Sequence, residues 1–278
     1  SYGVACYSNI KQPAFLSVNL TLGGAVYTEK DFTCYLNASR VKNSQRYSFQ
    51  RGFSEIYKIA NGAKTYSFGE EVAFSQGETP EIIPQPFALT PPVKTVEGKS
   101  FASGKFTVNS DLPEWKDRSI YQVGNKFEGY IKDELYECTT EKVCRYEFAR
   151  GDKTKTALTG GEYLDFDLGR NEAGFITVNL TVAKKAFVYI TFDEMISDKF
   201  CGVDPVRLDC CNVIKYELEK GEYSLESVEP YTAKLVRVIV ESGEIERISV
   251  NMRLLENADT YKVRLDFKDE KLNEILSA

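Results

Sequence analysis

The sequence predicts an all-β protein of two β-sandwich, jelly-roll-like domains, followed by the start of a linker helix at the C-terminus. Three observations predict this class. Many short segments alternate apolar and polar residues, which places one face of a strand on a core. Turn residues separate these segments at spacings of about 8 to 12 residues, as in sandwiches. Seventeen tyrosines and seventeen phenylalanines suit half-buried strands.

Residues 1–96 form the first expected domain, an N-terminal β-sandwich module. Apolar residues alternate weakly at residues 18–22 and predict a strand there, and residues 31–36 predict another. Residues 78–95 contain five of the nine prolines, and proline removes a hydrogen-bond donor from the backbone. We therefore expect an extended linker at 78–95 and a domain boundary near Val96.

Residues 97–267 form the second expected domain. Ile176, Val178 and Leu180 alternate with polar residues, as in a strand with one buried face. After a turn at residues 184–185, an almost continuous apolar run suits a strand buried on both faces. The strands expected in this domain are residues 176–182, 186–192, 214–218, 223–225, 236–240, 248–254 and 263–267.

The apolar spacing becomes helical in residues 268–278. Asp269 is a suitable N-cap, and Leu272, Ile275 and Leu276 at i, i+3 and i+4 form an apolar stripe. A helix of this length is marginal by itself in water. We therefore expect the start of a linker helix whose packing partner lies beyond the given sequence.

Four segments, taken in order, carry a family resemblance. They are DFDLGRNEAGFITVNL (165–180), ITFDE (190–194), CCNVIKYELEKGEYSLESVEPYTAKLVRVIVESGEIERISVNMRLLEN (210–257) and DFKDEKLNEIL (266–276). The last two resemble the region just before the catalytic domain of bacterial α-L-rhamnosidases of glycoside hydrolase family 78. The first two are similar to the preceding sandwich strands of that family, so the resemblance covers about residues 160–278.

The resemblance implies part of an enzyme and not the whole. In family 78, β-sandwich modules precede an (α/α)6 helical barrel, which supplies the acid and base carboxylates for inverting hydrolysis of terminal α-L-rhamnosides. This sequence resembles the modules and lacks the barrel, so no catalytic residue carries over. The implied parent is an inverting α-L-rhamnosidase, and the sequence at hand is expected to be inactive. The implied partners are the helical catalytic domain of the same polypeptide and a rhamnose-containing glycan.

Charge and hydropathy exclude two classes of partner. The net charge is -6, without a basic cluster longer than a pair, and such a surface repels phosphate backbones. We therefore expect no nucleic-acid partner. No apolar run approaches the roughly 20 residues that span a bilayer, so we expect no membrane partner and a cytoplasmic protein. Ser1 stands where a start methionine would, which leaves a removed signal peptide open.

The seven cysteines are expected to be reduced, mostly buried small side chains, because their number is odd and adjacent Cys210 and Cys211 cannot easily bond each other. No pair has the spacing of a zinc site, and the chain has no histidine. Catalytic systems that need histidine are thereby excluded. Phosphate-binding glycine motifs are also absent, so we expect neither metal nor cofactor.

Sugar-cleaving chemistry without histidine requires two carboxylates across a cleft. Asp165 with Asp167, and Asp193 with Glu194, are the acidic pairs to consider. Asp165 and Asp167 share one strand face, where like charges repel, and both pairs lie at strand ends, where solvated carboxylates are ordinary. We therefore expect no catalytic residue here.

Trp115 is the best single candidate for contact with a sugar. It is the only tryptophan and lies among Glu114, Lys116, Asp117 and Arg118, a polar frame for an aromatic face that stacks on a pyranose ring. The competing interpretation is a tryptophan that packs over the end of the sandwich and anchors its loop.

Three functions remain open from the sequence. The favoured one is the non-catalytic N-terminal β-sandwich portion of a rhamnosidase-like glycoside hydrolase, which stabilises the barrel and shapes its cleft. The alternative is an independent carbohydrate-binding or adhesion module, which predicts that the chain alone binds a rhamnose-containing oligosaccharide through Trp115. A self-contained enzyme is the third, and hydrolysis of an aryl α-L-rhamnoside by the chain would support it.

Overall fold

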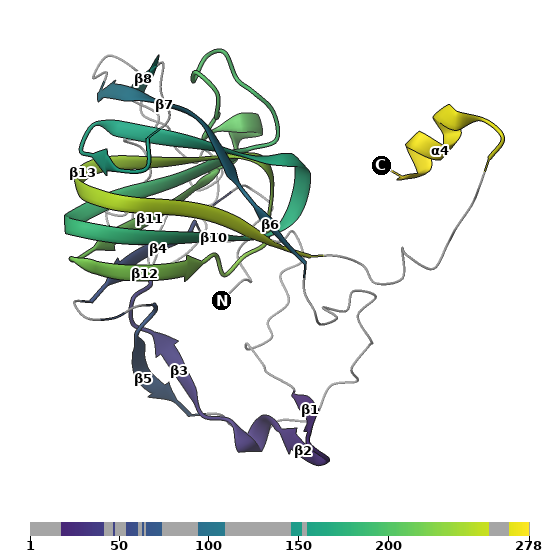
Figure 1. Cartoon of the computed structure of the whole chain (residues 1–278). Coiled ribbons are helices and arrows are strands. Elements are labelled where there is room, and N and C mark those ends of the chain that lie inside the picture. The colour runs from purple at the N-terminus through teal and green to yellow at the C-terminus, as the bar shows by residue number, and fades with distance from the viewer. Residues whose placement is uncertain are drawn as a thin grey trace, which may run out of the picture.

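The strands of this protein lie mostly in one folded-over sheet (Figure 1). The computed structural model describes residues 18–41, 47, 54–60, 63, 65–73, 94–108, 146–151, 155–255 and 267–277. The strands are β1 (Asn19–Leu22), β2 (Ala25–Thr28), β3 (Cys34–Asn37), β4 (Ile56–Ile59), β5 (Phe68–Val72), β6 (Thr95–Glu97), β7 (Lys99–Val108), β8 (Tyr146–Gly151), β9 (Leu158–Thr159), β10 (Glu162–Asp193), β11 (Val213–Leu218), β12 (Gly221–Glu226) and β13 (Tyr231–Leu254). The helical elements within the described ranges are the 3₁₀ helices η1 (Glu29–Asp31) and η2 (Arg207–Asp209) and the α-helix α4 (Glu270–Ser277). The prediction of an all-β fold with a short C-terminal helix is confirmed.

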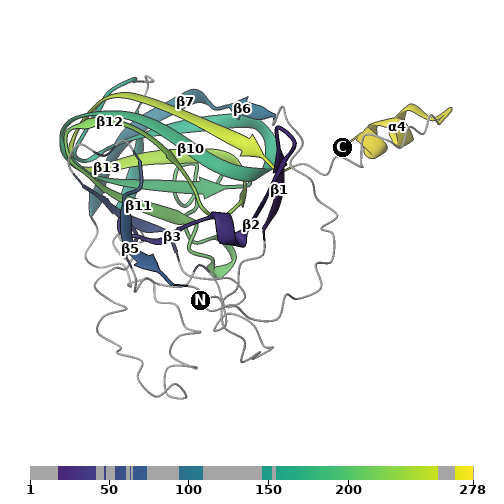
Figure 2. The same ribbon diagram turned by 90° about the horizontal axis from the view of Figure 1, so that it is seen from below.

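The register of β10 and β13 divides the large sheet into two layers, because both strands cross from one layer to the other. Layer A runs in the order β8, β7, β10 (162–167), β13 (235–242), β10 (186–193), β11 and β4. Layer B runs in the order β6, β13 (245–254), β10 (174–182) and β12. Layer B faces the reader in Figure 1, and the two layers lie one above the other in Figure 2.

The sequence predicts separate strands where the structure has two long bent ones. Residues 176–182 and 186–192 both belong to β10, and residues 236–240 and 248–254 both belong to β13. The bend of β13 requires glycine, because Gly243 has a φ of +96° and a Cβ there would lie 2.2 Å from the carbonyl oxygen of Lys185. Register shifts near Lys184 turn β10 at the same corner, as β-bulges do.

Alternation along the strands fills the space between the layers. Leu164, Val188 and Val238 of layer A, and Val178 and Val250 of layer B, belong to one buried apolar cluster. A second cluster lies on the opposite, outer face of layer A and is rich in aromatic residues. It contains Phe106, Tyr146, Tyr163, Tyr189, Cys211, Val213 and Ile239, with Phe148 packed against it. Layer A is therefore buried on both faces, as the nearly continuous apolar runs of its strands predict.

The N-terminal part contributes to the same sheet. β4 pairs in parallel with β11, so residues before Val96 extend layer A. The hairpin β1–β2 and the pair β3–β5 are separate two-stranded sheets below the sandwich in Figure 1. The expected strand at 31–36 begins only at Cys34, because residues 29–31 form η1. The division into two domains near Val96 stays a prediction, and residues 263–266 and 78–93 lie outside the described ranges.

The four described cysteines are free, and only one of them is buried. Cys211 is buried, whereas Cys34, Cys201 and Cys210 are half-buried. The expectation of mostly buried cysteines is therefore wrong for the described positions, because Cys201 and Cys210 lie in the connection between β10 and β11, outside the regular layers. No helix in the described ranges is long and apolar enough to cross a membrane.

Candidate functional site

Asp165, from the first acidic pair considered in the sequence, forms an ion pair with an arginine on the neighbouring strand. Asp165 of β10 lies opposite Arg237 of β13, and both side chains are fully buried. Arg237 Nε donates to Asp165 Oδ1 at 2.6 Å and Nη2 donates to Oδ2 at 2.9 Å. This is the bidentate geometry of a strong, charge-assisted arginine–carboxylate pair.

The same arginine holds a loop against the outer face of layer A. Its guanidinium lies 4.1 Å from the ring centroid of Tyr163 and 4.5 Å from that of Phe148. It also donates to the carbonyl oxygens of Phe200, at 2.8 Å, and Cys201, at 2.9 Å. Carboxylate, carbonyls and aromatic rings together compensate the buried charge.

Gly202 allows this close approach. Its φ is +139°, and a Cβ there would lie 3.0 Å from Arg237 Nη2 and 3.1 Å from Asp165 Oδ2. Any side chain would therefore meet the ion pair as well as an unfavourable backbone conformation. The backbone on both sides is fixed, since Gly202 and Ser197 exchange two backbone hydrogen bonds of 2.7 and 2.8 Å.

Burial raises the pKa of the Asp165 carboxyl above its ordinary value, although the hydrogen bond and charge of Arg237 act in the opposite direction. Asp167 serves a local purpose, because its Oδ1 accepts the backbone N–H of Gly169 at 2.7 Å where the register of β10 shifts. The two carboxylates thus have separate structural partners, and they do not form an acid–base couple.

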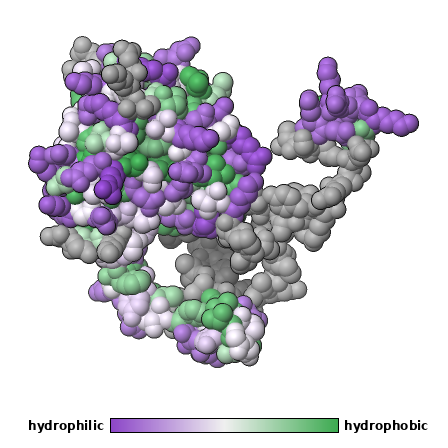
Figure 3. Space-filling model, in the orientation of Figure 1, coloured by the Kyte–Doolittle hydropathy of each residue, from purple (hydrophilic) through white to green (hydrophobic). Residues whose placement is uncertain are grey.

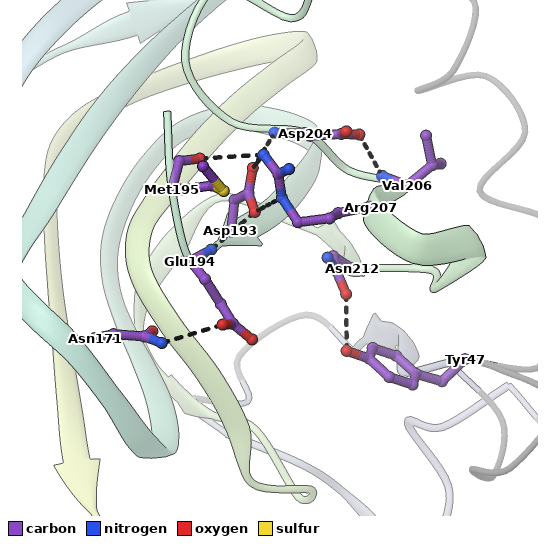
Figure 4. A network of polar contacts seen from close by, with 9 residues as sticks. All are labelled: Tyr47, Asn171, Asp193, Glu194, Met195, Asp204, Val206, Arg207 and Asn212. Carbon is purple, nitrogen blue, oxygen red and sulfur yellow. Dashed lines mark hydrogen bonds and ion pairs between the residues drawn. The ribbon is translucent and has the colours of Figure 1, made fainter. Parts of the chain in front are cut away.

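The second acidic pair lies where β10 ends and the covering loop begins (Figure 4). Asp193 is buried, and its carboxylate accepts the backbone N–H groups of Glu194, at 2.8 Å, and Asp204, at 3.0 Å. Arg207 adds two more donors, Nε to Oδ1 and Nη2 to Oδ2, the latter at 2.7 Å. Four donors saturate this carboxylate, and they join both ends of the loop.

The neighbours of Asp193 complete a network that closes the loop. Glu194 is exposed and accepts from Asn171 Nδ2 at 3.1 Å, so it points away from the Asp193 carboxylate (Figure 4). Asp204 Oδ1 accepts the backbone N–H of Val206 at 2.9 Å, and partial burial is the main cause that raises the pKa of its carboxyl. The hydrogen bonds that Arg207 donates to Asp193 raise the pKa of Arg207 above its ordinary value.

Solvated carboxylates at strand ends were expected for these pairs, and this expectation is wrong for Asp165 and Asp193. Both are buried because an arginine distant in the sequence reaches each of them. The sequence contains a signal for the first pair, since Arg237 interrupts the apolar run of residues 235–240. No comparable pattern marks Arg207.

A third buried carboxylate was missed from the sequence. Glu55, just before β4, accepts the hydroxyls of Tyr57, at 2.6 Å, and Tyr231, at 2.9 Å. It also accepts the backbone N–H groups of Val228 and Glu229, both at 2.9 Å. It therefore ties β4 to the connection between β12 and β13, over about 170 residues of sequence, as the separations of 173 and 174 show.

Trp115 lies outside the described residues, so its role in sugar contact stays a prediction. Within the part of the chain that the structure describes, no three cysteine or carboxylate side chains gather as metal ligands would. The geometry of the two Asp–Arg pairs holds a loop on layer A, and neither pair places a free acid opposite a free base.

Comparison with known proteins gives a partial likeness. No family model and no curated protein matches the sequence. Among solved structures, a GH78 family rhamnosidase of Bacillus sp. GL1 is similar, with 17% identity and a TM-score of 0.28 over 33% of this chain and 10% of that chain. A rhamnosidase from Klebsiella oxytoca with rhamnose bound is similar with 11% identity and a TM-score of 0.28, over 59% of this chain and 30% of that chain. The chain therefore spans less than a third of either rhamnosidase, and a likeness of this strength carries no argument about activity.

Proposed function

We propose that this chain is a non-catalytic β-sandwich portion of a glycoside hydrolase that resembles bacterial α-L-rhamnosidases. Its role is to stabilise a helical catalytic domain of the same polypeptide and to shape one wall of that domain's cleft. The ordered resemblance of residues 165–180, 190–194, 210–257 and 266–276 supports the proposal. The proposed location is the cytoplasm, where the free cysteines at the described positions would stay reduced.

The observation that carries the proposal is that the three buried carboxylates described above are all bound by donors of the protein itself. An inverting glycosidase needs one carboxyl that keeps a proton and one free carboxylate, both facing a substrate cleft. Asp165 is instead bound by two donors of Arg237, and Asp193 by arginine and backbone donors. Glu55 is bound by tyrosine and backbone donors. These three acids serve as cross-links between segments, which suits a supporting module.

Helix α4 offers a surface for the proposed helical partner. Asp269 Oδ1 accepts the backbone N–H of Lys271 at 2.9 Å, as an N-cap does. Asn273 exchanges two hydrogen bonds with the backbone of Phe267, of 2.7 and 2.8 Å, and these fix the approach to the helix. Leu272 and Ile275 are 45% and 72% exposed, so the apolar stripe of α4 is open to a partner.

The test is an activity comparison. The chain, and the complete product of the gene that encodes it, are assayed on 4-nitrophenyl α-L-rhamnoside at equal concentration. We expect turnover by the complete product and none above the buffer rate by the chain. Turnover by the chain would overturn the non-catalytic role. A complete product without a helical domain, or without activity on α-L-rhamnosides, would overturn the proposed parent.

A further inference from the structure

The outer face of layer B, which looks away from the core, is an open grid of polar side chains. Cross-strand pairing sets them in rows: Thr95, Arg253 and Phe175; Glu97, Asn251, Thr177 and Glu226; Ser249, Asn179 and Ser224; Arg247, Thr181 and Glu222. Twelve of these thirteen side chains are polar. In Figure 3, which shows this side, purple and white side chains lie between smaller green areas across the sandwich.

Short and long side chains occupy different parts of the grid. Its middle consists of short serine, threonine and asparagine side chains, such as Thr177, Asn179 and Ser249, all half-buried. Long charged side chains stand at the margins, with Glu97 on β6 at one edge and Glu222 and Glu226 on β12 at the other. An uncharged centre between charged edges suits an extended polar ligand that lies across the strands, because its amide and hydroxyl groups can donate and accept hydrogen bonds.

Much of the hydrogen-bonding capacity of the centre is unused. Asn179 Nδ2 donates to Ser249 Oγ at 3.1 Å, and Thr177 Oγ1 donates to Glu226 Oε2 at 3.2 Å. Asn251 and Thr181 have no side-chain hydrogen bond to any other described residue. Amide and hydroxyl groups of this kind can both donate to and accept from a ligand hydroxyl.

The charges of the rim select against ionic ligands. Three glutamates face two arginines, and Arg253 is already bound to Glu226 through Nε, at 2.9 Å, and Nη2, at 2.7 Å. The guanidinium of Arg253 also covers the ring of Phe175 at 4.2 Å from its centroid. The face therefore has neither a free cationic cluster for phosphate nor a bare aromatic surface for an apolar partner.

We propose that the outer face of layer B binds a neutral oligosaccharide through its central amide and hydroxyl side chains. A polyhydroxylated chain without charge matches the uncharged, donor-and-acceptor chemistry of the grid and the near balance of its rim. Contact rests on hydrogen bonds, so the affinity is modest. The proposal rests on this face alone, so it does not depend on the proposed parent enzyme or on Trp115.

The test is a binding measurement by titration calorimetry. The probes are di- to tetrasaccharides of rhamnose, galactose, glucose and xylose, at concentrations up to about 10 mM. The double variant Thr181→Ala/Asn251→Ala removes two side chains that have no hydrogen-bond partner among the described residues, so its fold is expected to be intact. The control variant is Thr107→Ala, an exposed strand threonine of β7 in layer A.

We expect at least one neutral oligosaccharide to bind, and the double variant to bind it about tenfold more weakly, because two hydrogen bonds are lost. The Thr107→Ala variant is expected to bind like the wild type. Three results would overturn the proposal: no neutral probe binds, binding is equal in the double variant, or a sulfated oligosaccharide binds more tightly than its neutral counterpart. Thermal unfolding of each variant verifies that a loss of binding is not a loss of fold.

Discussion

The two outer faces of the sandwich contrast in cover, polarity and chemistry. The outer face of layer A carries an aromatic cluster, a fully buried Asp–Arg pair and a loop that lies over them. The outer face of layer B carries short polar side chains and the Arg253–Glu226 ion pair, which solvent reaches. Since β10 and β13 supply strands to both layers, the same two segments build a sealed face and an open one. The difference shows that polar residues of one strand have two roles. In layer A they form a buried ion pair that holds the fold together, and in layer B they form a surface that solvent reaches.

The largest effect is expected at the buried pair of layer A. The variant Arg237→Met leaves the Asp165 carboxylate buried without its charge partner, which costs about 3–5 kcal/mol of unfolding free energy. The matched variant on layer B, Arg247→Met, removes an exposed arginine without a described partner and should change stability by less than about 0.5 kcal/mol. Urea unfolding of the three proteins measures both values.

A double variant separates lost charge pairing from lost packing. In Asp165→Leu/Arg237→Met neither charge of this pair remains, so much of the stability lost in the single variant should return. If the double variant is as unstable as the single one, the stacking of Arg237 on Tyr163 and Phe148 contributes more to the free energy of unfolding than its charge pairing with Asp165. Equal stability of the two single arginine variants would contradict the contrast between the faces.

An ion pair of the same type on each face gives a second, smaller comparison. The Asp193 side chain in the Arg207 pair is completely buried, whereas Glu226 and Arg253 on layer B are 36% and 29% exposed. We expect Arg207→Ala to cost about 1.5–3 kcal/mol, because hydrogen bonds to a buried charge are lost. Arg253→Ala should cost about 1 kcal/mol or less. Thermal unfolding and the rate of proteolysis within residues 194–212 report the two losses, and faster cleavage is expected only in Arg207→Ala.

The pair on layer B should also give the protein a stability that depends on acid. The hydrogen bond from Arg253 lowers the pKa of Glu226 below its ordinary value of 4.5. A lowered pKa in the folded protein means that this stabilisation is present above about pH 4.5 and is lost as the pH falls through the lowered pKa. In Glu226→Gln this part of the acid dependence should disappear. Urea unfolding from neutral to acid pH would show it, and parallel curves for the two proteins would contradict the role of the pair.

The smallest effect concerns backbone strain in the loop that covers layer A. Leu208 has a φ of +56° and is 89% exposed, so it occupies a left-handed conformation without packing that compensates it. Leu208→Gly should raise the free energy of unfolding by up to about 1 kcal/mol. The exposed Met195 of the same loop lacks a positive φ, and Met195→Gly should be destabilising. Destabilisation in both variants would show that strain at Leu208 is not significant.

The sequence predicted local features of the fold better than distant ones. Alternation identified residues 176–182 and 214–218 as strands, because each pattern depends only on neighbouring residues. It did not show that β10 and β13 continue through both layers, since a bend and a turn have similar composition. The parallel pairing of β4 with β11 joins segments about 160 residues apart, and no local pattern encodes it.

The same distinction applies to the candidate site. Asp165 and Asp193 were noticed as acidic residues at strand ends, but their environment depends on Arg237 and Arg207, which follow 72 and 14 residues later. Three of the four partners of Glu55 lie still further along the chain, at Val228, Glu229 and Tyr231. The polar grid on layer B requires the register of four strands, and the sequence provides only the alternation within each one.

The contrast between the two faces can be tested most directly by nuclear magnetic resonance of the isotopically labelled chain during titration with the tightest-binding neutral oligosaccharide. We expect the backbone amide signals of Thr177, Asn179 and Asn251 to shift, because these side chains are only half-buried on the outer face of layer B. The signals of Asp165, Tyr189 and Arg237 should stay unchanged, because these side chains are fully buried under the loop and the aromatic cluster of layer A. Shifts confined to the loop that covers layer A, residues 194–212, would contradict this assignment of a structural face and a contact face.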